Sequence, residues 1–197
     1  MRHLHIFLTT ALLLLICSGS LKAELDADLQ NRLQNIRLVV LDVDGTLTDG
    51  KVDYTSYGTF SKAFHVHDKV GIMLLQNAGI DVALISGENN DMIKSRAEKM
   101  KIRHVILECS FKRRALEDLV QGLNVPLNAV CYVADDVLDE EAMSISGFSA
   151  CPKDAVPRIR SMAHFVSSHK GGKGAVREVI DLILEAQGQP QTLSSLQ

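Results

Sequence analysis

An apolar run that ends abruptly in carboxylates is the clearest pattern in this chain. Residues 38–41, LVVL, follow one another without polar alternation, which predicts a strand buried on both faces of a parallel sheet. Asp42 and Asp44 come directly after this strand, and Gly45 allows the backbone to turn at once. Two like charges at a strand end are costly unless a cation or a reaction requires them. A simple Asx turn is the alternative explanation for the same residues.

Downstream of this strand, short apolar segments alternate with amphipathic segments of helical spacing. Strands are expected at residues 81–85, 104–107, 130–133, 147–150 and 165–167. Helices are expected at residues 68–78, 90–100, 112–123, 140–146, 155–162 and 175–186. In the first of these helices, Asp68 is the predicted N-cap and Gly79 the predicted stop. The alternation predicts βαβ units, and therefore an α/β fold with a Rossmann-like, doubly wound parallel sheet.

A β-hairpin is expected between the first strand and the first helix. Residues 51–54 and 59–66 are two short β-prone pieces around a turn, which predicts a small flap that projects near Asp42 and Asp44. His65 and His67 alternate on one face of the second piece. They are candidates to contact a substrate or to bind a transition metal. Packed or solvated histidines are the alternative, because no third ligand accompanies them.

Composition and charge exclude several classes of protein. With 197 residues, of which 46% are hydrophobic, the chain can bury one full core, and a single domain is the expectation. The 21 Lys and Arg residues and the 24 Asp and Glu residues give a net charge of −3 at pH 7. The chain therefore lacks the surplus of basic residues that would indicate a nucleic acid or an anionic membrane surface as its partner. The four cysteines form no CxxC pair, which argues against a disulfide framework and against a zinc site.

The two ends of the chain differ from the rest. Arg2 precedes an apolar run at residues 6–16, and residues 17–23 are small and polar, an order typical of a secretory signal peptide. The run is too short to favour a spanning helix, so residues 1–23 are expected to be removed on export to the periplasm, with no stable membrane insertion afterwards. An uncleaved anchor or a cytoplasmic protein is the alternative, and the lack of cysteine pairing favours the cytoplasm. The remaining chain is predicted to comprise a linker or short helix, the folded domain and a polar tail, at residues 24–35, 36–186 and 187–197.

Polar residues occupy the ends of several predicted strands. Right-handed crossovers place all these ends on one rim of the sheet, so their side chains can converge. The residues concerned are Asp42, Asp44, Ser86, Lys112, Asp135 and Asp136. In such a set a carboxylate can take up a phosphoryl group, Mg²⁺ held by oxygen ligands offsets the clustered charge, and a lysine with a hydroxyl can hold the phosphate oxygens. A second carboxylate can protonate the leaving oxygen and then activate water.

Four short motifs in this order resemble those of the haloacid dehalogenase-like phosphatase superfamily. They are DVDGT at residues 42–46, ISG at 85–87, the lysine of SFKRR at 110–114 and VADDVLD at 133–139. The resemblance implies that Asp42 is the nucleophile and Asp44 the acid/base, with Ser86 and Lys112 as the other catalytic residues. It also implies Mg²⁺ as the cofactor. The implied ligands are Asp42, the Asp44 carbonyl and Asp135, with Asp136 or Asp139 in support.

The resemblance narrows over residues 36–186. The hairpin with KAFHVHD, the absence of an inserted cap domain and the late GGKGAVREV are similar to the 3-deoxy-D-manno-octulosonate 8-phosphate phosphatases and their nonulosonate 9-phosphate relatives. Members of this group are homotetramers in which the hairpin and tail of one subunit help to close the neighbour's site. The resemblance therefore implies a homotetramer whose site is shielded from bulk water without a cap.

Departures from the octulosonate pattern concern the substrate. Glu88 and His67 stand where those enzymes have arginines, whereas Glu88, Arg96 and Lys99 are more similar to the phosphatases of nine-carbon 2-keto-3-deoxy sugar acids. Arg96 and Lys99 lie one helical turn apart and can face an acidic sugar together, although a solvated helix face would explain them equally. The predicted substrate-binding set is His65, His67, Asp68, Glu88, Arg96 and Lys99.

The sequence therefore predicts a Mg²⁺-dependent phosphomonoesterase that acts through an aspartyl-phosphate on a phosphorylated 2-keto-3-deoxy sugar acid. A broad-specificity sugar phosphatase is one alternative. A non-catalytic tetrameric phosphatase-like module is another. The acid/base expected at Asp44 disfavours that module, because a silent domain has no need of one.

Overall fold

The computed structural model describes residues 27–54, 56 and 60–192. The signal peptide predicted for residues 1–23 and the last part of the polar tail lie outside the described residues, so both stay predictions. Among the helices that are described, none is long and apolar enough to cross a membrane.

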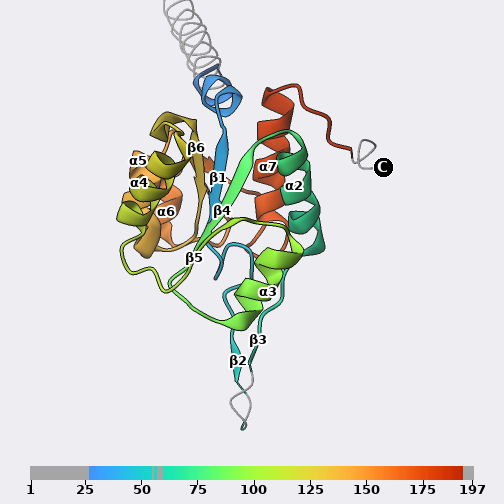
Figure 1. Ribbon diagram of the computed structural model, residues 1–197, viewed down its shortest axis with the longest axis vertical. Helices are drawn as coiled ribbons and strands as arrows, with labels where there is room; N and C mark the ends of the chain where they lie inside the picture. Colours follow the sequence, from blue (N-terminus) through green and yellow to red (C-terminus); the bar gives the residue numbers. More distant parts are fainter. Residues whose placement is uncertain (1–26, 55, 57–59, 193–197) are drawn as a thin grey trace, which may run out of the picture.

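A parallel sheet forms the centre of the described structure (Figure 1). Its strands are β1 (Leu38–Leu41), β4 (Asp81–Ile85), β5 (His104–Ile106), β6 (Val130–Val133), β7 (Phe148–Cys151) and β8 (Phe165–Val166). Within the described chain these six strands follow the order β5-β4-β1-β6-β7-β8, and every neighbouring pair is parallel. The predicted doubly wound α/β sheet is therefore confirmed. β1 lies between β4 and β6, where the strand order changes direction.

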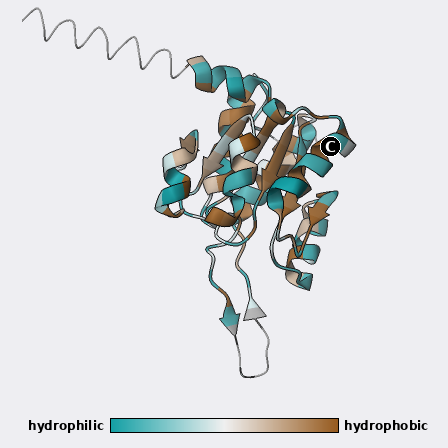
Figure 2. Cartoon of the chain, turned by 90° about the vertical axis from the view of Figure 1, so that its left-hand side faces the viewer, coloured by the Kyte–Doolittle hydropathy of each residue, from teal (hydrophilic) through white to brown (hydrophobic). Residues whose placement is uncertain are grey.

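Helices cover both faces of the sheet (Figure 1). They are α2 (Val66–Asn77), α3 (Asp91–Lys99), α4 (Lys112–Leu123), α5 (Glu140–Ile145), α6 (Pro157–Met162) and α7 (Ala175–Ala186), with short 3₁₀ turns η1 (Leu127–Ala129) and η2 (Val137–Asp139). Helices α2, α3 and α7 pack on one face and α4, α5 and α6 on the other. Figure 2 shows apolar strands between helices whose outer surfaces are polar, so the sheet forms the middle of the core.

The four residues of β1 divide their side chains between the two halves of the core. Leu38 and Val40 pack with α4, α5 and α6, whereas Val39 and Leu41 pack with α2, α3 and α7. All four are fully buried. This two-sided burial explains the unbroken apolar sequence of β1, and it fixes the position at which Asp42 leaves the sheet.

The hairpin is shorter than the sequence predicts. β2 (Asp53–Tyr54) and β3 (Phe60–Ser61) pair antiparallel, and the hairpin projects from the carboxyl end of the sheet (Figure 1). The predicted second strand at 59–66 is wrong beyond Ser61, because α2 already begins at Val66 with His65 as its N-cap. The prediction that His65 and His67 share a strand face is wrong for the same reason, since His67 lies in the first turn of the helix.

Asp68 holds two helices together instead of capping its own. The predicted N-cap role is wrong, because Asp68 is the third residue of α2 and is only 1% exposed. Its Oδ1 accepts a hydrogen bond of 2.8 Å from the backbone N–H of Arg177, in the first turn of α7. A carboxylate at that point accepts a hydrogen bond from a backbone N–H that has no partner within α7. Its negative charge is also stabilised by the positive end of the α7 dipole. The start of α2 is thereby attached to the start of α7.

The segment before β1 packs onto the domain. Residues 27–34 are helical, within the segment for which the sequence predicts a linker or a short helix. Leu33 is buried in the core and Leu29 packs against it. Gln187, at the end of α7, donates from Nε2 to the carbonyl oxygens of Leu33 and Ile36, at 3.0 and 2.9 Å.

The glycine loop before α7 rests on the loop that follows β1. The N–H of Gly172 donates to the carbonyl oxygen of Thr46 at 3.0 Å. A Cβ atom on Gly171 would lie 1.8 Å from the carbonyl oxygen of Gly45, which leaves no room for a side chain. Only glycine permits this contact between the two backbones, so α7 sets the position of the loop after Asp42.

Gly171→Ala is expected to lower the free energy of unfolding by about 1–3 kcal/mol, because its methyl group would overlap backbone atoms of the facing loop. Gly122→Ala is the matched control. Gly122 lies in the last turn of α4, and nothing lies within 4 Å of the place a Cβ would take, so this change should be neutral or stabilise by up to about 1 kcal/mol. Urea unfolding measures both variants. Equal stability of the two variants would contradict the close contact.

Candidate active site

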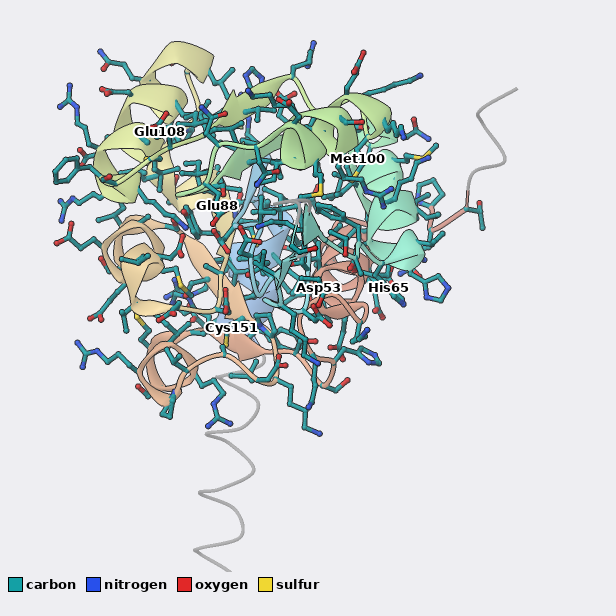
Figure 3. The ribbon with its side chains drawn as sticks, turned by 90° about the horizontal axis from the view of Figure 1, so that it is seen from below. Asp53, His65, Glu88, Met100, Glu108 and Cys151 are labelled. Atoms are coloured by element: carbon teal, nitrogen blue, oxygen red, sulfur yellow. The ribbon has the colours of Figure 1, made fainter. Side chains whose placement is uncertain are left out.

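The polar strand ends predicted from the sequence meet at the carboxyl edge of the sheet. Asp42 and Asp44 follow β1, Ser86 follows β4, Asp135 lies two residues past β6, and Lys112 is the first residue of α4. Figure 3 views this edge, with Glu88 close to its middle. Crevices at this edge, beside the point where the strand order reverses, are where open α/β sheets bind ligands.

A buried lysine connects two of the carboxylates. Lys112 Nζ donates to Asp42 Oδ1 at 2.6 Å and to both oxygens of Asp139 at 2.7 and 2.8 Å. Its side chain is 5% exposed. Burial alone would lower the pKa of Lys112, but Asp42 and Asp139 outweigh burial and raise it. Lys112 is therefore a permanent cation at neutral pH, held in one orientation.

Tyr132 completes the support for this lysine. Its hydroxyl donates to Asp139 Oδ1 at 2.8 Å from inside the core. Asp139 thus binds Lys112 and Tyr132. Sequence analysis missed Tyr132, because a tyrosine within the apolar run of β6 carries no signal beyond that of a core residue.

The negative charges of the carboxylates at this edge are only partly balanced by neighbouring cations and hydrogen-bond donors. Burial raises the pKa of Asp42, with the nearby Asp139 adding to the rise and Lys112 opposing it. Burial likewise raises the pKa of Asp135 to about 6, opposed by a hydrogen bond from Thr46. Asp44 Oδ2 is buried and has no hydrogen-bond partner among the described residues. A divalent cation held by Asp42 and Asp135 would offset the negative charge of these two carboxylates.

Asp135 is held against the loop that follows β1. Thr46 Oγ1 donates to its Oδ1 at 3.2 Å, and a Cβ on Gly45 would lie 2.0 Å from its Oδ2. No group of three His, Cys, Asp or Glu side chains in the described chain is arranged to hold a metal. The predicted magnesium site nevertheless fits, because it needs only the side chains of Asp42 and Asp135 together with the carbonyl of Asp44. These are the hard oxygen donors that Mg²⁺ prefers.

The supporting ligands predicted for magnesium have other partners. Asp139 is engaged by Lys112 and Tyr132. Asp136 is exposed, and its Oδ1 accepts from the backbone N–H of Val137 at 2.7 Å as the cap of η2. Both carboxylates therefore already accept hydrogen bonds within the described chain.

Ser86 is placed to donate a hydrogen bond. It is 1% exposed, and its Oγ accepts from the backbone N–H of Glu88 at 3.1 Å. Because the oxygen already accepts this bond, the hydroxyl hydrogen can be directed at a bound oxyanion. That geometry suits the predicted role in holding a phosphate oxygen.

Lys62 belongs to the site but was not predicted. It follows β3, and its Nζ contacts Asp44 Oδ1 and lies 3.4 Å from Glu88 Oε2. Its side chain is fully buried. A lysine beside a hairpin ordinarily indicates a solvated charge, so no local pattern predicted its contact with Asp44. The path of the chain after β3 could not be deduced from local patterns.

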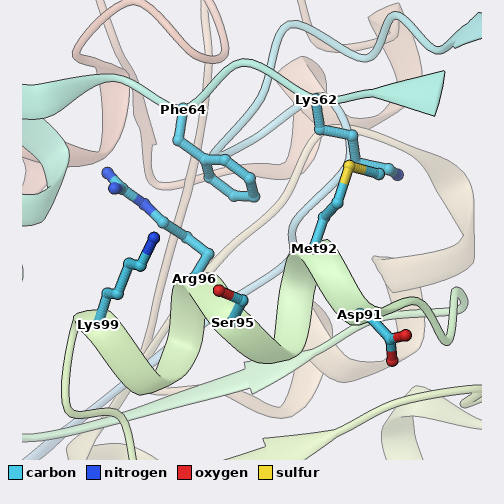
Figure 4. Close-up of a pocket in the computed structure, with 7 residues that line it drawn as sticks. All are labelled: Lys62, Phe64, Asp91, Met92, Ser95, Arg96 and Lys99. Atoms are coloured by element: carbon cyan, nitrogen blue, oxygen red, sulfur yellow. The ribbon is translucent and has the colours of Figure 1, made fainter. Parts of the chain in front are cut away.

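A pocket of about 370 Å³ lies beside Lys62 (Figure 4). It is lined by Lys62, Phe64, Asp91, Met92, Ser95, Arg96 and Lys99. The guanidinium carbon of Arg96 lies 5.2 Å from the centre of the Phe64 ring, and Arg96 Nε is buried without a partner in the described structure. The predicted pair on α3 is therefore brought to a pocket next to Asp44, and both side chains line it.

The other four predicted substrate-binding residues do not line this pocket. Glu88 lies beside Lys62, with its Oε2 3.4 Å from Nζ. Asp68 is buried in the contact between α2 and α7, which favours a structural role. His65 faces Gly174, where a Cβ would lie 3.6 Å from its ring. His67 borders a separate cavity of about 270 Å³ with His169, Lys173 and Arg177.

The chain is similar to known phosphatases in sequence and in structure. No family model matches the chain. The 3-deoxy-D-manno-octulosonate 8-phosphate phosphatase KdsC of Haemophilus influenzae is 37% identical over 169 residues, which cover 86% of this chain and 94% of that protein. The crystal structure of the Yersinia pestis phosphatase is 40% identical, with a TM-score of 0.80 over 82% of this chain and 87% of that one.

A third relative was crystallised with ligands. The phosphatase of Moraxella catarrhalis, in complex with magnesium ion, phosphate ion and a KDO molecule, is 36% identical, with a TM-score of 0.80 over 81% of this chain and 92% of that one. Identity at this level over most of both chains shows common descent and a common fold. The chain thus belongs to the KdsC-type 3-deoxy-D-manno-octulosonate 8-phosphate phosphatases of the haloacid dehalogenase-like superfamily.

Proposed function

We propose that residues 36–186 form a Mg²⁺-dependent phosphomonoesterase that acts through an aspartyl-phosphate on a 2-keto-3-deoxy sugar acid phosphate. The substrate is 3-deoxy-D-manno-octulosonate 8-phosphate or a nonulosonate 9-phosphate. The observation that carries the proposal is the buried ion pair between Asp42 and Lys112, 2.6 Å long, beside the Asp44 carboxylate. A nucleophile, a cation and a proton carrier then lie at one strand end.

In the first step, a carboxylate oxygen of Asp42 attacks phosphorus, and the bond from phosphorus to the sugar oxygen breaks. Lys112 and the Ser86 hydroxyl hold the phosphate oxygens, on which negative charge is concentrated. Asp44, in its protonated form, gives its proton to the departing sugar oxygen. The products are the free sugar acid and a phosphoryl group bound to Asp42.

In the second step, water attacks the same phosphorus, and the bond to Asp42 breaks. Asp44, now a carboxylate, accepts the proton of the attacking water. Inorganic phosphate leaves, Asp42 returns to a carboxylate, and Asp44 is protonated again. The two aspartates therefore keep distinct roles through the cycle.

The side chains of Asp42 and Asp135 and the carbonyl of Asp44 are the proposed magnesium ligands. When bound, Mg²⁺ offsets the negative charge of the carboxylates and polarises the phosphoryl group. The raised pKa of Asp135, which burial pushes to about 6, supports a cation at this position. Further support comes from the magnesium and phosphate in the Moraxella relative.

The pocket beside Lys62 is the proposed site for the sugar acid. Arg96, whose buried Nε has no partner in the described part of the chain, suits a carboxylate of the substrate. Glu88 would repel that carboxylate, so it is assigned to the sugar hydroxyls. The relatives favour the eight-carbon substrate, whereas Glu88, Arg96 and Lys99 favour the nine-carbon one.

Two further features stay proposals. One is a homotetramer, supported by the resemblance and by the projecting hairpin. Export is the other, supported by the apolar run at residues 6–16. Light scattering during size-exclusion chromatography and N-terminal sequencing of the mature protein measure them directly.

Asp42→Asn is expected to abolish phosphate release in the presence of Mg²⁺ while leaving the fold intact, because the amide keeps the shape of the side chain but is a poor nucleophile. Asp81→Asn makes the same change at the amino end of β4, where Asp81 pairs with Arg103 near the surface. This control should keep wild-type activity. Phosphate release and circular dichroism, measured on both variants, check the proposal, and an active Asp42→Asn enzyme would overturn it.

A kinetic comparison tests the substrate class. The eight- and nine-carbon keto-acid phosphates are expected to give kcat/KM values at least tenfold above those of simple phosphosugars, because only they place a carboxylate near Arg96. Arg96→Leu should raise KM for the acids by about tenfold or more, the effect of losing a charged hydrogen bond.

Lys94→Leu is the control on the same helix, since Lys94 does not line the pocket. Its KM should match the wild type. Comparable rates on simple phosphosugars would instead favour the broad-specificity alternative. If the wild-type protein neither bound Mg²⁺ nor released phosphate from any of these substrates, the non-catalytic module would be favoured.

A further inference from the structure

We infer that Phe64 is a positioning residue for Arg96. Its ring holds the guanidinium of Arg96 in place and leaves the N–H groups of that guanidinium free for the carboxylate of a substrate. The inference rests on the proposed function, in which Arg96 binds that carboxylate. It assigns a residue of the segment between β3 and α2 to substrate selection, outside the motifs at the strand ends.

The guanidinium of Arg96 has no acidic partner in the described part of the chain. Arg96 forms no ion pair with another described residue, and its buried Nε has no hydrogen-bond partner there. Other arginines of the described chain differ in this respect, since Arg103 and Arg158 each pair with an acidic side chain. The donors of an arginine in such a pair are already engaged, whereas those of Arg96 are available to a bound carboxylate.

The Phe64 ring takes the place of an acidic partner. The guanidinium carbon of Arg96 lies 5.2 Å from the ring centre, and Figure 4 shows the ring beside the Arg96 side chain. A cation within about 6 Å of a ring centre is attracted by the negative face of the ring. This attraction occupies no N–H donor, whereas a carboxylate of the protein would occupy one or two. The ring can therefore restrain the guanidinium without competing with a substrate.

Phe64 is itself held by the fold. It packs against the core cluster on the α2, α3 and α7 side of the sheet, and the next residue, His65, is the N-cap of α2. Arg96 comes from α3, so the contact joins two separate elements. Lys99 lies one helical turn further along α3, lines the same pocket and repels Arg96. The ring therefore opposes a movement of the guanidinium away from the pocket.

A restrained guanidinium favours acidic substrates. When a sugar acid enters the pocket of about 370 Å³, its carboxylate meets a side chain that loses little further freedom on binding. A substrate without a carboxylate gains nothing from this restraint. The competing explanation is that Phe64 only fills the core or forms a wall of the pocket, in which case its loss would affect every substrate and would not depend on Arg96.

Phe64→Leu is expected to raise KM for the preferred keto-acid phosphate about three- to fivefold with kcat unchanged, because the cation–π contact is lost while the apolar bulk is kept. Ribose 5-phosphate has no carboxylate, so its kcat/KM should not change. Phe64→Tyr keeps the ring face and should retain the wild-type KM for the acid. Steady-state release of phosphate measures all three variants and substrates.

Arg96→Leu separates positioning from packing. In that background Phe64→Leu should cause no further rise in KM, because the ring has no guanidinium left to hold. Phe165→Leu is the matched control, since Phe165 in β8 is also partly buried against the same core cluster but does not line the pocket. It should leave KM unchanged. If Phe64→Leu fails to fold by circular dichroism, Phe64→Met replaces it, with the same expected result.

Three outcomes would overturn the role of Phe64 while leaving the phosphatase proposal intact. They are an unchanged KM for the acid in Phe64→Leu, an equal loss on ribose 5-phosphate, and a further rise in KM in the Arg96→Leu background. Activity retained by Asp42→Asn would instead overturn the phosphatase proposal itself. The two failures are therefore distinguishable.

Discussion

A lysine buried between carboxylates is the interaction on which the rest of this structure depends. Lys112 lies between Asp42 and Asp139 at distances of 2.6 to 2.8 Å, with little access to water. Removing one partner from such a buried pair typically costs about 3–5 kcal/mol, because the other charge is left uncompensated. The fold must therefore bring the ends of β1 and β6 and the start of α4 together within a narrow tolerance. In the proposed mechanism this lysine has two tasks, because it holds the nucleophile Asp42 and binds a phosphate oxygen.

The sheet satisfies the requirement through burial on both sides. β1 fills both halves of the core, so it cannot slide or turn without exposing apolar side chains. Tyr132 reaches out of β6 to hold Asp139, and the glycine loop before α7 presses on the loop after β1. Three elements thus hold the residues at this edge. The strands fix their starting points, the Tyr132 hydroxyl binds Asp139, and the loop before α7 packs on the loop after β1. In the described structure, the pocket beside Lys62 and α3 lies on the remaining side of this edge.

Local patterns were sufficient for the strands of the parallel sheet and for the residues at their ends. An unbroken apolar run predicted β1, and right-handed crossovers predicted that Asp42, Ser86 and Asp135 converge. Local patterns could not predict contacts that depend on the path of an irregular segment. Lys62 meets Asp44 only because of the path that the chain takes after β3. Helix α2 begins two residues before its predicted cap, and Asp68 instead accepts a hydrogen bond from the neighbouring helix α7. The side chains that sequence patterns place poorly are those held by tertiary contacts.

Because Asp68 is attached to α7, this helix positions two separate segments of the site. Its leading loop locates the loop after β1, and its first turn locates the start of α2, a few residues after Lys62. The loop that carries Asp44 and the segment that carries Lys62 are therefore both attached to α7. A displacement of α7 would move the Asp44 carboxylate and the Lys62 ammonium in the same direction. Their relative alignment is insensitive to small movements of the rest of the molecule.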